Sequence, residues 1–187
     1  MAFQLKIQLK NVTNPPVWRQ VIVPEKFTFQ NLHQLIQLVF GWEDDHLFQF
    51  SPKGYGSHPI IAIPSKDDWE HPDMNALKTK LSKVITAEKQ TFTYIYDFGD
   101  DWVHHILVEK IVPDEVKSPV CLNGKGACPP EDCGGPWGYE NLKIITADPS
   151  HEEHLEMKGW LGLEEDEDWD ANYFEIDEIN QILKDFK

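Results

Sequence analysis

Two short stretches of the sequence combine residues that can do chemistry. The first, Tyr94-Ile-Tyr-Asp-Phe-Gly-Asp-Asp-Trp-Val-His104, holds three aspartates and a histidine. The second, Cys128-Pro-Pro-Glu-Asp-Cys-Gly-Gly135, holds two more carboxylates between prolines and glycines. Carboxylates can bind a cation, a basic side chain or a hydroxyl-bearing ligand, and a histidine beside a carboxylate can transfer protons. We therefore expect the site in these two stretches.

The three aspartates of the first stretch have two possible roles. Asp97, Asp100 and Asp101 can accept hydrogen bonds from backbone N–H groups of a turn, in which Gly99 can adopt a positive φ. Turn geometry would occupy one or two of these carboxylates. At least one is then left for a ligand.

His104 lies on the strand that follows this turn. Because side chains alternate along a strand, it shares a face with Trp102 and Ile106, whereas His105 points to the opposite face. The pattern favours a hydrogen-bonded core histidine. The alternative is an acid or base that uses Asp97 or Asp100 as its partner.

The second stretch has a backbone suited to presenting its carboxylates. Pro129 and Pro130 stiffen the chain, and Gly134 and Gly135 permit a sharp turn or a close backbone approach. Glu131 and Asp132 between them could recognise a ligand or cap a helix that begins near Tyr139.

The cysteines do not indicate a metal site. Cys121, Cys128 and Cys133 are odd in number and lack the Cys-x-x-Cys spacing of zinc ribbons. A cysteine nucleophile would need a neighbouring base and a lowered pKa. We predict structural thiols, no metal and no cofactor.

Two motifs nearer the N-terminus add further candidates. In Pro15-Pro-Val-Trp-Arg19, the arginine could pair with one of many acids or bind a ligand carboxylate bidentately. In Gly41-Trp-Glu-Asp-Asp-His46, Trp42 and His46 follow a predicted helix.

Composition limits the classes of function. The chain has 187 residues and a net charge of -15, which opposes binding to the phosphates of nucleic acids. The mean hydropathy is -0.47, and no apolar stretch reaches the roughly 20 residues of a membrane helix. The N-terminus has no basic and apolar secretion signal, so we predict a soluble, cytoplasmic protein without a membrane partner.

Periodicity predicts the elements that hold these residues. Alternation favours antiparallel strands at 3–10 and 17–23, a further strand at 46–50, and a hairpin formed by 92–96 and 102–108. Helical spacing indicates a helix at 29–40, between Thr28 and Gly41, and others after 139 and from 176 to 186. Residues 113–138 are predicted to be a long loop.

Four blocks of the sequence together resemble the plasmid pRiA4b ORF-3-like family. They are Pro15-Pro-Val-Trp-Arg19, Phe40-Gly-Trp42 with His46-Leu-Phe-Gln-Phe50, Tyr94 to His104, and Pro129-Pro-Glu-Asp-Cys-Gly-Gly135. The resemblance implies an α+β domain with an antiparallel sheet and packed helices. The biochemical role of this family is unestablished, and some of its members are connected with mobile elements.

We therefore predict one α+β domain over residues 1–187, an antiparallel β-sheet with several packed helices. The leading hypothesis is a binding or interaction module for a small ligand or a protein, with a polar cleft between the two stretches. The alternatives are a hydrolase, with or without a metal, that uses His104 with nearby carboxylates, and an accessory protein of a mobile element or DNA-associated complex. The candidate binding residues are Asp97, Asp100, Asp101, Trp102, His104, Pro130, Glu131, Asp132, Gly134, Gly135, Arg19, Trp42 and His46.

Overall fold

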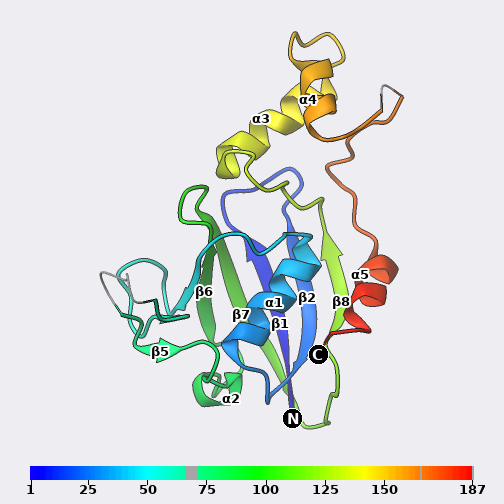
Figure 1. Ribbon diagram of the computed structural model, residues 1–187. Coiled ribbons are helices and arrows are strands. Elements are labelled where there is room, and N and C mark those ends of the chain that lie inside the picture. The colour runs from blue at the N-terminus through cyan, green and yellow to red at the C-terminus, as the bar shows by residue number, and fades with distance from the viewer. Residues whose placement is uncertain (66–70, 165, 187) are drawn as a thin grey trace.

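The fold is built on one twisted sheet. The computed structural model describes residues 1–65, 71–164 and 166–186, which form an eight-stranded sheet in the order β5-β4-β3-β6-β7-β1-β2-β8 (Figure 1). Neighbouring strands are antiparallel except for the short β4–β5 pair. The strands are β1 (Ala2–Leu9), β2 (Trp18–Pro24), β3 (Phe48–Ser51), β4 (Ile61–Ala62), β5 (Met74–Asn75), β6 (Thr91–Tyr96), β7 (Trp102–Val112) and β8 (Val120–Lys125).

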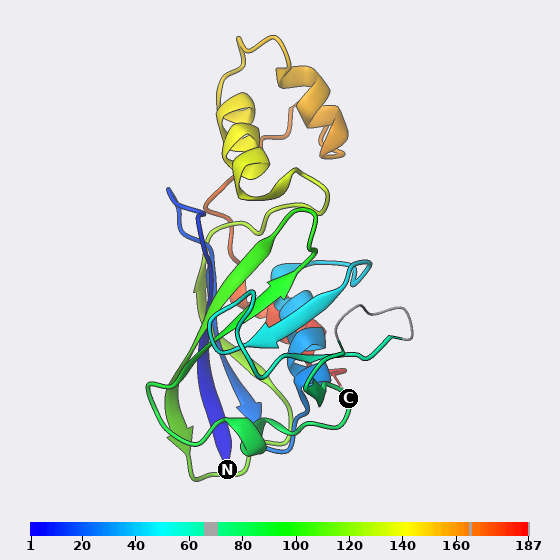
Figure 2. The ribbon, with the colours of Figure 1, turned by 90° about the vertical axis from the view of Figure 1, so that its left-hand side faces the viewer.

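Helices cover one face of this sheet and one of its ends. The helices are α1 (Phe29–Phe40), α2 (Leu81–Val84), α3 (Gly135–Ala147), α4 (His154–Trp160) and α5 (Ile176–Leu183). Figures 1 and 2 show α1 lying across one face, with α5 beside it near β8, while α3 and α4 stand beyond the end of the sheet. The α+β class with a largely antiparallel sheet is confirmed.

Residue alternation explains why only one sheet face needs a helical cover. On β1, Phe3, Leu5 and Ile7 are buried, while the polar residues between them are partly exposed. The apolar stripe of α1 packs onto this buried face through Leu32, Leu35 and Ile36. Thr28 caps the first turn of α1, and Gly41 ends the helix with a φ of 76°, so both predicted boundaries are confirmed.

The long loop predicted for 113–138 is wrong in two places. Val120–Lys125 forms the edge strand β8, paired with β2. Its sequence ends in Asn-Gly-Lys and buries only Cys121 fully, so it lacks the alternating apolar pattern of a half-buried strand. Helix α3 begins at Gly135 rather than near Tyr139, because Pro136 fits the first turn of a helix, where no backbone N–H is needed.

The β6–β7 hairpin is confirmed, and its turn, residues 97–101, differs in detail from the prediction. Tyr96 pairs with Trp102 across the hairpin. The left-handed positions of the turn are Asp97 and Asp101, with φ values of 54° and 59°, and Gly99 is not among the residues with positive φ. Aspartate tolerates this conformation better than most residues with a side chain.

Arg19 is a structural clamp. The chain's only arginine is buried and donates hydrogen bonds to backbone carbonyls: Nε to Val39 O at 2.9 Å, Nη1 to Lys125 O at 3.0 Å and Nη2 to Gly126 O at 3.1 Å. Its guanidinium also lies over the Phe174 ring. In place of either alternative considered from the sequence, an acidic partner or a ligand carboxylate, Arg19 links the end of α1 to the end of β8.

His104 and Trp102 belong to the core. His104 is fully buried, its Nδ1 lies 2.9 Å from Trp102 O, and its ring is surrounded by Phe40, Trp42 and Tyr94. Burial lowers the pKa of His104 to about 3, so the imidazole is neutral. The structure thus gives it the core position and does not bring it to Asp97 or Asp100.

Among the described residues, none of the helices combines the length and apolar character needed to cross a bilayer.

Replacing Arg19 with lysine tests the clamp. Lysine keeps the charge but cannot reach the carbonyls of α1 and β8 together, because it lacks the planar fork of the guanidinium. Losing two charged hydrogen bonds should lower the free energy of unfolding by about 3 kcal/mol or more, measured by urea unfolding. Lys6→Ala, which removes a partly exposed cation over the Trp18 ring, should cost less than about 1 kcal/mol. Equal costs would contradict the clamp.

The pH dependence of stability tests the buried His104. Between a pH of about 6.5 and the folded-state pKa of about 3, the His104 imidazole binds a proton only in the unfolded chain. The free energy of unfolding therefore falls as the pH drops through this range. Between pH 7 and pH 5, the wild type should lose about 2 kcal/mol more than His104→Asn, whose amide can still donate to Trp102 O. Urea unfolding at both pH values measures this difference. Equal losses would show that His104 is accessible to protons.

Candidate functional site

Three segments far apart in the sequence meet at the end of the sheet nearest α3. They are residues 41–47 after α1, the hairpin turn (97–101), and residues 128–135, here called the Pro-Pro loop. Strand β3 pairs with β6, so the Asp97 N–H donates to Leu47 O at 3.0 Å and His46 lies beside Asp97. Strand pairing thus explains the contact between residues 41–47 and the hairpin turn.

His46 sits among three carboxylates. Its Nε2 lies 3.4 Å from Asp132 Oδ1, 3.6 Å from Glu131 Oε2 and 3.8 Å from Asp97 Oδ2. The side chains of His46, Asp97 and Glu131 are 31%, 12% and 16% exposed, whereas that of Asp132 is 75% exposed. We call these four residues the His46 cluster. It opens to solvent at Asp132.

Hydrogen bonds fix two of the carboxylates of this cluster. Glu131 Oε1 accepts from the Tyr96 hydroxyl at 2.9 Å and from the Glu43 N–H at 2.8 Å, so its Oε2 faces His46. Asp97 Oδ1 accepts from the Gly99 N–H at 2.8 Å, which turns Oδ2 towards His46. Burial raises the pKa of Tyr96, so its hydroxyl remains a donor.

The Pro-Pro loop is held against both other segments. Trp42 Nε1 donates to Pro129 O at 2.9 Å. On the other side, the Gly134 N–H donates to Asp100 Oδ2 at 3.1 Å. At Gly135, with a φ of 68°, a Cβ atom would lie 2.3 Å from Asp100 O, so only glycine permits this approach. The two polar stretches identified in the sequence are therefore in contact.

The remaining candidates lie outside the His46 cluster. Asp101 Oδ1 accepts from the Tyr55 hydroxyl at 2.8 Å. Trp42 is 5% exposed, and its ring stacks on that of Tyr96 with 5.1 Å between the ring centroids. It therefore supports the cluster from the core side. Arg19, Trp102 and His104 are buried as described above, and Pro130 with the two glycines shapes the loop.

The cysteines have the properties of structural thiols. Burial raises the pKa of Cys133 to about 12 and also raises the pKa values of Cys121 and Cys128. Their thiols therefore stay protonated near neutral pH, which disfavours nucleophilic attack.

A buried polar network beside α1 was missed from the sequence. His33 is fully buried, with Nδ1 2.8 Å from the Tyr94 hydroxyl and Nε2 2.6 Å from Asp44 Oδ1. Gln37 donates to the same hydroxyl and accepts from the Asp44 N–H. Both ring nitrogens of His33 are occupied, so the network positions Asp44 rather than leaving a free base. Helical spacing alone had placed His33 and Gln37 on α1 without assigning them partners.

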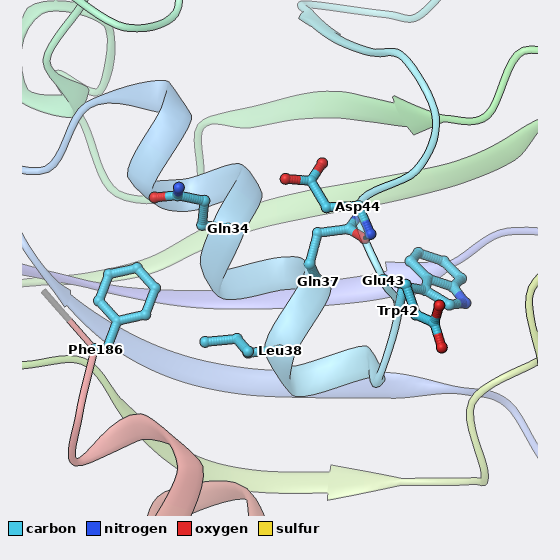
Figure 3. Close-up of a pocket in the computed structure, with 7 residues that line it drawn as sticks. All are labelled: Gln34, Gln37, Leu38, Trp42, Glu43, Asp44 and Phe186. Atoms are coloured by element: carbon cyan, nitrogen blue, oxygen red, sulfur yellow. Dashed lines mark hydrogen bonds between the residues drawn. The ribbon is translucent and has the colours of Figure 1, made fainter.

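Asp44 borders a cavity of about 360 Å³. Figure 3 shows Gln34, Gln37 and Leu38 along α1, with Phe186 across from Asp44. Glu43, which also lines this cavity, binds Glu131 through its backbone. The cavity is thus a neighbour of the His46 cluster on the α1 side.

Relatives of the chain are themselves of unknown function. It is 35% identical to the uncharacterized protein y4hQ of Sinorhizobium fredii (strain NBRC 101917 / NGR234), over 97% of this chain and 90% of that protein. It is similar to the crystal structure of the protein of unknown function MM3350 from Methanosarcina mazei Go1, with a TM-score of 0.81 and 37% identity over 95% of this chain and 96% of that one.

The family profile of plasmid pRiA4b ORF-3-like proteins matches residues 1–178. This span includes every strand, the hairpin turn and the Pro-Pro loop. The resemblance noted in the sequence is confirmed, and the chain belongs to the plasmid pRiA4b ORF-3-like family.

Proposed function

We propose that this protein is a binding module whose His46 cluster holds a divalent metal ion. The observation that carries the proposal is the convergence of one imidazole nitrogen and two carboxylate oxygens. The ligand atoms of His46, Asp97 and Asp132 all lie within 4.8 Å of one another. Glu131 provides a third carboxylate oxygen, 3.6 Å from His46 Nε2.

The distances suit a shared ion better than direct hydrogen bonds. Good N–H···O bonds are about 2.7–3.2 Å long, whereas His46 Nε2 lies 3.4–3.8 Å from the three oxygens. Ligand atoms bound about 2.1 Å from a tetrahedral Zn²⁺ lie about 3.4 Å from one another. A donor set of one imidazole and several carboxylates suits Zn²⁺ or Mn²⁺ more than Ca²⁺.

Charge and preorganisation also support cation binding. The three carboxylates share the basic group of His46, so the cluster favours an added positive charge. Glu131 and Asp97 are already oriented by Tyr96, Glu43 and Gly99. Hydrogen bonds that already orient the ligand side chains lower the cost of ordering them when a metal binds.

The arrangement of this site favours binding over hydrolysis through His104. That imidazole is buried against Trp102 O and aromatic rings, and its lowered pKa makes it a poor base. His46 is the histidine that lies with the carboxylates. The geometry therefore supports the binding hypothesis, with His46 rather than His104 beside the carboxylates. The proposed metal ion replaces the expectation, drawn from the sequence, of a site without a metal.

Metal titration of the purified chain tests the proposal. After treatment with a chelator, Zn²⁺ or Mn²⁺ should bind with a 1:1 stoichiometry by calorimetry and raise the melting temperature, because only the folded chain presents the cluster. His46→Ala and Asp97→Asn should each weaken binding by about tenfold or more.

Two control variants separate this site from others. His105→Ala removes an exposed histidine from the face of β7 opposite to His104. Cys133→Ser removes a thiol next to Asp132 in the sequence that could bind Zn²⁺. Both should bind as the wild type does. Absence of binding to the wild type, or binding lost with Cys133→Ser but kept with His46→Ala, would contradict the proposal.

A further inference from the structure

The helices α3 and α4 expose an unusual amount of apolar surface. Their exposed large side chains are Trp137 at 88%, Leu155 at 69%, Ile144 at 63% and Trp160 at 51%. Exposed apolar patches mark interaction sites, and tryptophan is enriched among the residues that dominate binding energy. Figures 1 and 2 show that both helices project beyond the sheet, where a partner can reach them.

A cavity of about 310 Å³ lies between these helices. Its apolar wall includes Leu142, Met157 and Trp160. Asn141 also lines it, and Trp137 and Ile144 lie four residues before and three residues after Asn141 on α3, hence on the same helical face. The exposed apolar residues therefore run alongside the cavity and extend the surface beyond it.

The charges around the cavity indicate the kind of partner. The described residues that line it include the carboxylates of Asp132, Glu153 and Glu156 and no basic side chain. The lysines of these helices are engaged elsewhere: Lys143 with Glu140 and Thr13 O, and Lys158 with Asp168. A complementary partner brings its own positive charges.

We propose that this surface docks a basic segment of another protein. An aliphatic or aromatic side chain of the segment enters the cavity against Leu142 and Trp160, and flanking lysines or arginines pair with Glu153 and Glu156. A second copy of this chain is a poor occupant, because its net charge is -15 and carboxylates would face carboxylates. A small molecule in the cavity would leave Trp137 and Ile144 uncovered. The inference does not depend on a metal at the His46 cluster.

Selection from a phage library of random peptides on the immobilised full chain tests this proposal. Selected peptides should share an aromatic or aliphatic residue flanked by lysine or arginine. A synthetic peptide of that consensus should bind less tightly as salt is added. Its affinity, measured by calorimetry, should fall about tenfold or more in Trp160→Ala and in the double variant Glu153→Gln/Glu156→Gln.

The double variant changes two exposed side chains conservatively, so it keeps the test valid if Trp160→Ala fails to fold. Leu77→Ala, which removes an exposed apolar side chain between β5 and α2, should bind as the wild type does. Three outcomes would overturn the proposal. They are a selection without a basic and apolar consensus, equal binding to the wild type and the double variant, and self-association of the chain that Trp160→Ala abolishes.

Discussion

The arrangement of the site depends on the buried guanidinium of Arg19. Its donors bind Val39 O at the end of α1 and Lys125 O and Gly126 O at the end of β8. The segment with Trp42 and His46 leaves the first of these points, and the Pro-Pro loop leaves the second. Because the rigid guanidinium fork donates to both of these points, the two segments start from fixed positions. An arginine placed in this way organises a site that it does not enter.

The two histidines show how the fold separates support from binding. His104, on β7, fills a space between aromatic rings and stays neutral. His46 lies outside the strands, half exposed among carboxylates. Trp42 connects these layers, since its ring contacts His104 at 5.3 Å while its Nε1 binds Pro129 O. Trp42 therefore links the packed core to the Pro-Pro loop, which carries Glu131 and Asp132.

Local patterns predicted most of the fold, whereas long-range contacts decided the site. Alternation predicted β1, β2 and the β6–β7 hairpin, and the apolar stripe between Thr28 and Gly41 predicted α1. The edge strand β8 escaped prediction because its stability comes from pairing with β2 rather than from its own residues. His46 and Arg19 were named as candidates, but the partners that fix their roles are 20 to 107 residues away. Those of Arg19 are backbone carbonyls, which any residue type supplies. No local periodicity reports such contacts.

Anomalous diffraction can locate a metal ion at the His46 cluster. Crystals of the full chain soaked in Zn²⁺ would be measured at the zinc absorption edge. We expect one anomalous peak about 2.1 Å from His46 Nε2 and from carboxylate oxygens of Asp97 and Asp132. A map without a peak at this position, or with its strongest peak at Cys128 or Cys133, would contradict it.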